Sequence, residues 1–216
     1  MTRTQLRLTI ASIVVVIAVA TLALRSTGSR GTLVFNGAGW KVMYNGYGHV
    51  GVRDGQFLLS PTPPVSPDNS VTHAALVTTT SSFGDLRLTA QLRTTRQLRP
   101  GTANPWEVAW LLWHLTDSQH FYAITLKPNG WELTKQVPGM PGGQQFLRTG
   151  ASPQFPVNQW YELLVVQRGA RVAVSVDGVP LVSFTDPAPY LSGSVGLYTE
   201  DAAVAFRRIH IAKGDE

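Results

Sequence analysis

Hydrophobic and polar residues alternate in many short runs along this chain, and turn-forming residues separate one run from the next. Alternation with a period of two gives a segment one apolar and one polar face, which is typical of half-buried β-strands. The clearest case is residues 85–93, where Leu86, Leu88, Ala90 and Leu92 alternate with polar side chains. Asp-Gly at positions 54–55 and 177–178 favours tight hairpins between such strands. The pattern predicts a protein built of β-strands after residue 31.

The predicted strands are short, and turns or loops lie between them. We expect strands at residues 32–35, 50–52, 56–59, 74–79, 85–93, 107–116, 120–126, 131–137, 160–168, 171–176, 181–185, 194–199 and 203–211. We expect loops at residues 60–69, 99–105 and 138–156, the last of which is rich in glycine and proline. About a dozen short strands in one unit predict an all-β sandwich or jelly roll of two antiparallel sheets.

The N-terminus differs from the rest because residues 8–24 are apolar and carry no charge. Arginines flank this run at both ends: Arg3, Arg7, Arg25 and Arg30. The length and the preceding arginines favour a transmembrane anchor with a cytoplasmic N-terminus. Two alternatives stay open: a signal peptide, because Ala18-Val19-Ala20 has the small-x-small form that a signal peptidase accepts, and a buried core helix. We expect residues 1–7 in the cytoplasm, an anchor at 8–24, a linker at 25–31, a jelly-roll domain at 32–212 and a tail at 213–216.

Composition and charge exclude several classes of function. The chain has 18 Lys and Arg against 13 Asp and Glu, but four of the arginines belong to the first 30 residues. The exported domain is therefore nearly neutral, so the basic balance is no sign of nucleic-acid binding. Cysteine is absent, which excludes disulfides, thiolate metal sites, a cysteine nucleophile and a lipid-modified cysteine.

Residues 104–136 concentrate the side chains that suit carbohydrate recognition, including four of the six tryptophans and two of the five histidines. Three consecutive strands would array them on one sheet. We expect Ile124, Leu126 and Leu133 to face the core. The other face would then present a groove to solvent, lined by Thr125, Lys127, Glu132, Thr134 and Gln136. Exposed aromatic rings stack on sugars and polar side chains bond hydroxyls, although the same tryptophans would also suit a core.

The candidate binding residues extend into the predicted loop at 138–156, because loops of this length often line a site. Its polar candidates are Gln144, Gln145 and Arg148, and the alternative is a surface loop held by Phe146, Leu147 and Phe155. The full set of candidate binding residues is Trp110, His114, Tyr122, Thr125, Lys127, Glu132, Gln136, Gln145 and Arg148.

Four segments of the second half carry a resemblance to a known fold. They read W-Y-E-L-L-V-V (160–166), V-A-V-S-V-D-G (172–178), S-G-S-V-G-L-Y (192–198) and V-A-F-R-R-I-H-I (204–211). This series resembles concanavalin A-like jelly rolls, in particular the 3-keto-disaccharide hydrolase or family-sixteen-like glycoside hydrolase domains. The resemblance covers roughly residues 33–211 and implies a scaffold shared by lectin-like and hydrolytic proteins.

An enzymatic function is the first alternative, with Glu107, His114, Glu132 or Tyr122 as acid and base in a glycoside hydrolase or lyase. Family-sixteen glucanases resemble one another through Glu-x-Asp-x-x-Glu, and this motif is absent here. Retaining hydrolysis needs two carboxyl groups about 5 Å apart, and the sequence places no second carboxylate beside Glu107. A structural calcium ion is a further possibility, with Glu200 and Asp201 as its candidate ligands.

The leading hypothesis is a membrane-anchored, extracytoplasmic jelly roll that binds a cell-wall glycan or another polysaccharide. Its expected partners are this glycan and, through the N-terminal helix, the membrane, and no nucleic acid is expected. The second alternative is an assembly subunit of a membrane complex, in which the aromatic segment would contact a protein partner. If the N-terminal segment is cleaved, the domain is secreted.

Overall fold

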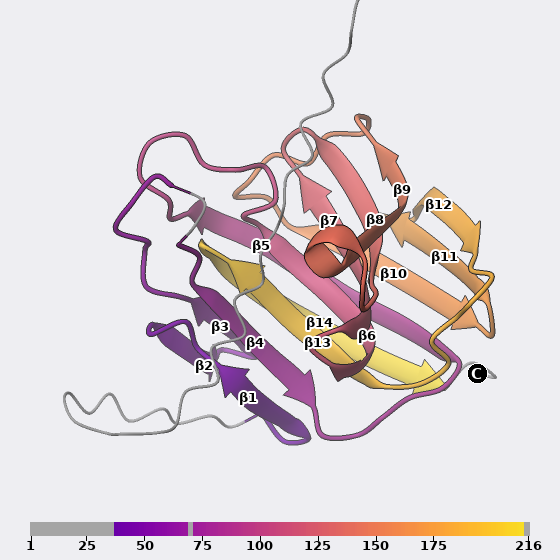
Figure 1. Ribbon diagram of the computed structural model, residues 1–216. Coiled ribbons are helices and arrows are strands. Elements are labelled where there is room, and N and C mark those ends of the chain that lie inside the picture. The colour runs from indigo at the N-terminus through magenta and orange to yellow at the C-terminus, as the bar shows by residue number, and fades with distance from the viewer. Residues whose placement is uncertain (1–36, 69–70, 214–216) are drawn as a thin grey trace, which may run out of the picture.

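Two seven-stranded antiparallel sheets pack against each other in the computed structural model, which describes residues 37–68 and 71–213 (Figure 1). The first sheet has the order β1 (Trp40–Tyr44), β4 (Ala74–Thr79), β13 (Ser194–Glu200), β6 (Ala109–Asp117), β7 (His120–Lys127), β8 (Gly130–Gln136) and β9 (Gln144–Gly150). The second has the order β12 (Val179–Thr185), β11 (Arg171–Val176), β10 (Tyr161–Arg168), β5 (Leu86–Gln97), β14 (Ala202–Lys213), β3 (Gln56–Ser60) and β2 (His49–Arg53). The prediction of an all-β jelly-roll sandwich is confirmed.

Local sequence explains the hairpins. Asp54, Gly55, Asp177 and Gly178 all have positive φ angles, between 50° and 79°. Two successive residues with positive φ are what a two-residue hairpin turn requires, and Asp-Gly adopts this conformation at low cost. These two turns join β2 to β3 and β11 to β12, as the sequence predicted.

Two expectations about the elements are corrected. Residues 138–156 are not a continuous loop, because they contain the short 3-10 helix η1 (Pro141–Gly143) and the strand β9, which pairs with β8. Strand β1 was not expected, and it pairs with β4 at one edge of the first sheet. The run Gln144–Gly150 alternates weakly, so periodicity alone does not distinguish this edge strand from a loop.

The N-terminal anchor, the linker and the strand expected at 32–35 lie outside the described residues. Within residues 37–68 and 71–213, no helix is both long and apolar enough to cross a membrane.

The main core lies between the two sheets. Leu111, Trp113, Tyr122 and Ile124 project into it from the first sheet, and they meet side chains such as Phe206 of the second sheet. Trp113 and Tyr122 stack with ring centroids 5.4 Å apart. Ile124, Leu126 and Leu133 are buried in this core, as expected from their alternation.

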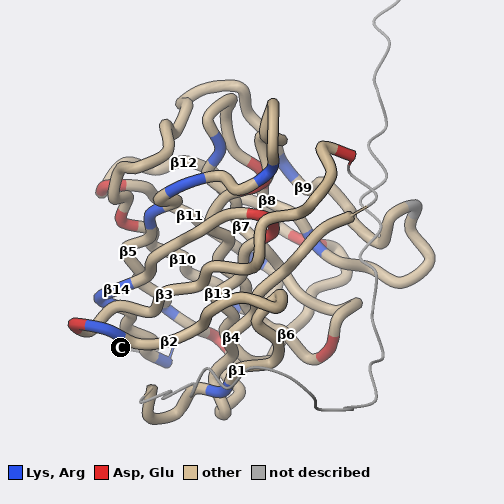
Figure 2. The backbone as a smooth tube through the Cα atoms, turned by 90° about the vertical axis from the view of Figure 1, so that its left-hand side faces the viewer, with Lys and Arg blue, Asp and Glu red and all other residues tan. Residues whose placement is uncertain are grey.

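A second apolar cluster covers the opposite, outer face of the first sheet. It consists of Leu76, Val108, Trp110, Leu112, Phe121, Ala123 and Tyr198. Helix η1 lies over part of this face, because Gly142 and Trp110 line the same small void. Lys and Arg, in contrast, are spread over both sheets and their loops rather than gathered on one face (Figure 2). The outer face of the first sheet is therefore the apolar surface on which a site is formed.

Candidate functional site

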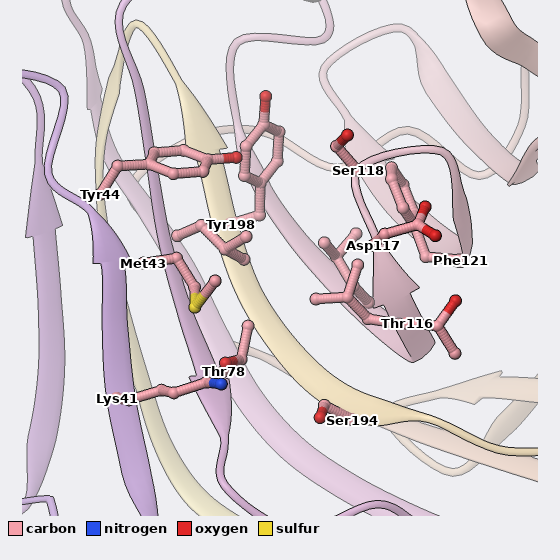
Figure 3. A pocket seen from close by; sticks show the side chains of 13 residues that line it. Lys41, Met43, Tyr44, Thr78, Thr116, Asp117, Ser118, Phe121, Ser194 and Tyr198 are labelled. Carbon is pink, nitrogen blue, oxygen red and sulfur yellow. The ribbon is translucent and has the colours of Figure 1, made fainter. Parts of the chain in front are cut away.

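A pocket of about 170 Å³ opens on the outer face of the first sheet. Its walls come from β1, β4, β13, β6 and β7, together with the turn that joins β6 to β7 (Figure 3). Each of these strands sends alternate side chains outward, so residues far apart in the sequence meet at one place.

Part of the pocket lining is apolar and aromatic. Its residues are Met43, Tyr44, Leu76, Leu112, Leu115, Phe121 and Tyr198, with Tyr44 and Tyr198 on one side and Phe121 beside Asp117 and Ser118 on the other (Figure 3). Tyr198 lies opposite Leu76 in the β4–β13 pair. Its ring packs edge-to-face with that of Trp110, and the two ring centroids are 5.6 Å apart. A register shift in β1 between Val42 and Tyr44 accompanies the exposed position of Tyr44, which is 44% accessible at the pocket. The rings of Phe121 and Tyr198 are thus held in place by the packed second cluster.

Polar residues also line the pocket, and they come from four neighbouring strands. Lys41 of β1 lies directly opposite Thr78 of β4, and Thr78 lies opposite Gly196 of β13. Ser194, two residues before Gly196, pairs with Leu115 of β6, and Thr116 follows. The Thr78 hydroxyl is buried and has no hydrogen-bond partner among the described residues.

The β6–β7 turn supplies the acidic group of the pocket, Asp117. Its carboxylate accepts hydrogen bonds from the ring of His120 at 2.8 Å and from the backbone N–H of Gln119 at 2.7 Å. Partial burial opposes ionisation, but these hydrogen bonds outweigh it and hold the pKa of Asp117 below its ordinary value. Asp117 is therefore an ionised, already partnered group at the far end of the pocket from Lys41 (Figure 3).

A buried carboxyl group lies behind the ring of Tyr198. The Tyr198 hydroxyl donates a hydrogen bond of 2.6 Å to Glu200, which lines a void of about 10 Å³ beside the pocket with Gln136 and Gln144. Burial, with the charges of Asp201 and Glu107, raises the pKa of Glu200 to about 7 against the opposing effects of Tyr198 and Arg99. Burial and the neighbouring Glu200 also raise the pKa of Tyr198 well above its ordinary value. A carboxyl group with such a pKa is suited to proton transfer near neutral pH.

Glu107 was a candidate acid or base, and the structure places it away from the pocket. It is fully buried and pairs with the Nε of Arg99, while the side chain of Asn104 donates a hydrogen bond of 2.7 Å to it. Arg99 also pairs with Asp201 at 2.5 Å and donates to the backbone carbonyl of Asp68 at 2.7 Å. Glu107 therefore helps hold together the loops at one end of the sandwich.

His114 and Tyr122 are also away from the pocket. Both are fully buried, and the two ring nitrogens of His114 contact the carbonyl oxygens of Tyr190 and Gly84 at 2.7 and 2.8 Å. The Tyr122 hydroxyl donates a hydrogen bond of 2.5 Å to Asp186. His114 was a candidate binding residue, and its inward position coincides with the irregular β6–β7 pairing between Trp113 and Asp117.

The remaining residues of the predicted groove lie on the outer face but beside the pocket. Trp110 and Gln136 line the small void next to it. Thr125 is fully buried, Thr134 is 1% accessible, and Lys127 forms an ion pair with Glu132. None of these candidate residues lines the pocket, and most of their side chains are buried.

Gln145 and Arg148 lie on the edge strand β9. Gln145 is exposed and pairs with Lys135 of β8, whereas the guanidinium of Arg148 lies 4.6 Å from the ring centre of Phe184 in the second sheet. Neither residue lines the pocket.

The expected exposed tryptophans are replaced by other rings. Trp110, Trp113 and Trp131 are buried, and only Trp106 of this segment is half-buried. The rings at the pocket belong to Tyr44, Phe121 and Tyr198. The Gly-Leu-Tyr run 196–198 was noticed only as a fold signature, although its tyrosine faces outward next to a buried acid.

No metal site emerges from the described ranges, where no group of three or more His, Asp or Glu side chains could hold an ion. The proposed calcium ligands are engaged otherwise, because Glu200 accepts a hydrogen bond from Tyr198 and Asp201 pairs with Arg99.

Comparison with known sequences connects this fold to one family. Residues 31–212 match the 3-keto-alpha-glucoside-1,2-lyase-like domain. The chain belongs to this family. The resemblance noted in the sequence is thereby confirmed, while no curated protein matches the chain.

Several solved structures are similar to this 3-keto-alpha-glucoside-1,2-lyase-like domain. The carbohydrate binding module CBM66 from Bacillus subtilis is 14% identical, with a TM-score of 0.63 over 84% of this chain and 99% of that one. A Bacillus subtilis protein of unknown function with a galectin-like fold is 15% identical, with a TM-score of 0.59 over 82% and 90% of the two chains. A native glycosidic hydrolase is 11% identical, with a TM-score of 0.55 over 82% and 90%. At these identities the likeness establishes the fold.

Family and fold together identify the chain as a jelly-roll domain of the 3-keto-alpha-glucoside-1,2-lyase-like family. The pocket on the outer face of the first sheet brings together rings, hydroxyl groups and one ammonium group.

Proposed function

We propose that this protein is an extracytoplasmic, membrane-anchored domain that binds carbohydrate, and that the outer-face pocket holds one sugar ring. The observation that carries this proposal is a pocket whose lining combines aromatic rings with hydroxyl groups and one ammonium group. An engineered apolar cavity of about 150 Å³ is large enough for benzene, so a pocket of about 170 Å³ accommodates a six-membered ring.

The chemistry of the walls matches that of a pyranose. A pyranose presents C–H groups on its faces and hydroxyl groups around its rim, so it needs an apolar surface next to hydrogen-bonding groups. Phe121 and Tyr198 supply the apolar surface. Thr78, Thr116 and Ser194 also line the pocket, and their hydroxyl groups would bond the rim of a bound ring.

The test is a glycan array followed by isothermal titration with the purified full-length protein. Tyr44→Ala removes an exposed ring from the pocket, and we expect it to weaken binding of the selected glycan by at least fivefold. Tyr47→Ala is the matched control, because Tyr47 is 71% exposed and lies outside the pocket. Equal affinities of the two variants, or no glycan binding by a folded protein, would contradict the proposal.

A lyase is the second candidate, and the Tyr198–Glu200 pair favours it. In a 3-keto-glucoside the ketone acidifies the hydrogen on C2. A base that removes this proton allows the C1–C2 double bond to form, while the C1–O bond breaks and the leaving oxygen takes a proton. Glu200, with a pKa of about 7, is the candidate base, and Tyr198 at the pocket wall is the group through which it contacts the ligand space.

This candidate is tested by incubating the protein with a 3-keto-glucoside and recording the ultraviolet absorbance of the unsaturated ketone. Glu200→Gln is expected to abolish product formation, whereas Glu162→Gln, an exposed change on β10, is expected to preserve it. If wild-type protein produces no unsaturated ketone, binding without cleavage is the remaining function.

The membrane location rests on residues 8–24, whose apolar length and flanking arginines suit a single span. Membrane fractionation and N-terminal sequencing of the mature protein test it. An intact N-terminus in the membrane fraction is expected. A new N-terminus after residue 20 would instead establish a cleaved signal peptide and a secreted domain.

A further inference from the structure

The lining of the pocket contains a cation without an acidic partner. Lys41 is exposed on β1, and no ion pair within the described ranges includes it. The other lysine on the outer face of the first sheet is Lys127, and it pairs with the carboxylate of Glu132. The ammonium of Lys41 is therefore available to a ligand in the pocket.

A second polar group at the same corner also lacks a partner. The Thr78 side chain is 1% accessible, it lines the pocket, and its hydroxyl makes no hydrogen bond among the described residues. Lys41 and Thr78 are directly opposite each other on neighbouring strands, and Figure 3 shows both on the same side of the pocket. A buried hydroxyl without a partner costs free energy, which a bound acceptor or donor would recover.

Acidic groups do not neutralise this corner. Asp117 is the single acidic residue of the pocket wall, and it is bound to His120 on the β6–β7 turn, across the pocket from β1. The Glu200 carboxyl lies behind Tyr198, and its raised pKa lowers its charge near neutral pH. The β1–β4 end of the pocket is therefore locally positive.

We propose that the pocket selects sugars that carry a carboxylate, such as hexuronic acids, and that Lys41 and Thr78 bind this carboxylate while the ring lies against Phe121 and Tyr198. This inference rests on the proposed sugar-binding function and specifies its ligand class. One ammonium with one hydroxyl matches the single charge of a carboxylate, whereas dianionic phosphate groups are usually bound by several donors.

The experiment compares hexuronate oligosaccharides with their methyl-esterified counterparts, which have the same ring and linkage but no charge. Titrations with full-length wild-type protein are expected to give at least tenfold tighter binding of the acidic member of the preferred pair. This difference should shrink as salt is added, because the pairing is electrostatic. Lys41→Met should abolish the difference by weakening binding of the acid, Lys41→Arg should retain it, and Thr78→Val should reduce it.

Lys213→Met is the matched control, since it removes the same charge from an exposed position at the end of β14 in the second sheet. It should leave both affinities unchanged. Equal binding of acid and ester, with Tyr44→Ala weakening both, would overturn the carboxylate proposal and leave the sugar-binding function intact. Absence of binding to every sugar by folded protein would overturn both.

Discussion

Tyr198 donates a hydrogen bond of 2.6 Å to Glu200, two residues further along β13, and both side chains are buried. Alternation along the strand places the two groups on the same outer face, where the tyrosine ring lines the pocket and the carboxyl lies behind it. The wall of the pocket is therefore connected directly to a group that titrates near neutral pH.

The first prediction concerns stability as a function of pH. The pKa of Glu200 is about 7 in the folded protein, against 4.5 for an unperturbed glutamate. Because the folded-state pKa is the higher one, the folded state binds the proton more tightly. Its contribution to stability is fully present below pH 4.5 and is lost as the pH rises through 7. We expect a loss on the order of 2–3 kcal/mol across this window.

Chemical denaturation of wild-type protein and Glu200→Gln between pH 4.5 and 8 checks this prediction. The difference in unfolding free energy between the two proteins should change across the window in the stated direction. Glu162→Gln, on the exposed face of β10, should show no comparable change relative to wild type. A pH-independent difference for Glu200→Gln would contradict the assignment.

The second prediction concerns Arg99, which pairs with two buried carboxylates, Glu107 and Asp201. Arg99→Met leaves both carboxylates buried without their partner, so a loss of about 3–5 kcal/mol in unfolding free energy is expected. Arg53→Met is the control, because its ion pair with Asp54 is more than 80% exposed on both sides and should contribute less than about 1 kcal/mol. Urea denaturation measures both. Equal losses in the two variants would show that the buried network is not stabilising.

The strands could be predicted because their signals are local. The alternation in β5 and the Asp-Gly turns each depend on a few neighbouring residues, and the structure has them where the sequence placed them. Edge strands β1 and β9 were missed, since an edge strand is partly exposed on both faces and its pattern is weak.

The site was harder to predict because it depends on how neighbouring strands pair and on which parts of the sheet surface other segments cover. Period-two alternation correctly put Thr125 and Leu126 on opposite faces, but it gave no information on which part of the outer face is covered. An irregular pairing in β6 moved His114 inward, and the partner of Glu107 lies on a loop eight residues earlier in the chain. Buried ion pairs of this kind are tertiary contacts without a sequence pattern.

The third prediction separates a structural role of Tyr122 from a role in the site. Its hydroxyl donates to Asp186, which also pairs with Lys135 at 2.8 Å. Burial opposes ionisation of Asp186, but hydrogen bonds from Lys135 and Tyr122 hold its pKa below the ordinary value. Tyr122→Phe removes one bond to a charged group, so we expect a loss of about 2 kcal/mol in stability and unchanged glycan affinity.

Thermal unfolding and titration measure the two quantities for Tyr122→Phe. Tyr161→Phe is the control, because its hydroxyl bonds the carbonyl of Pro156 at 3.0 Å in an exposed setting and should contribute about 0.5 kcal/mol or less. Weaker glycan binding by Tyr122→Phe without a loss of stability would place Tyr122 in the site instead.

The fourth prediction concerns Thr78 and its neighbour Thr79, which differ in hydrogen bonding although both are buried in β4. The Thr78 hydroxyl has no partner among the described residues, whereas the Thr79 hydroxyl donates to Ser81 at 2.8 Å and accepts from Val195 at 3.0 Å. Valine preserves the shape of threonine and removes the hydroxyl. Thr78→Val should therefore raise the unfolding free energy of the unliganded protein by about 1 kcal/mol, and Thr79→Val should lower it by about 1–3 kcal/mol. Chemical denaturation without sugar gives both values, and a loss of stability in Thr78→Val would show that the hydroxyl already has a partner in the unliganded protein.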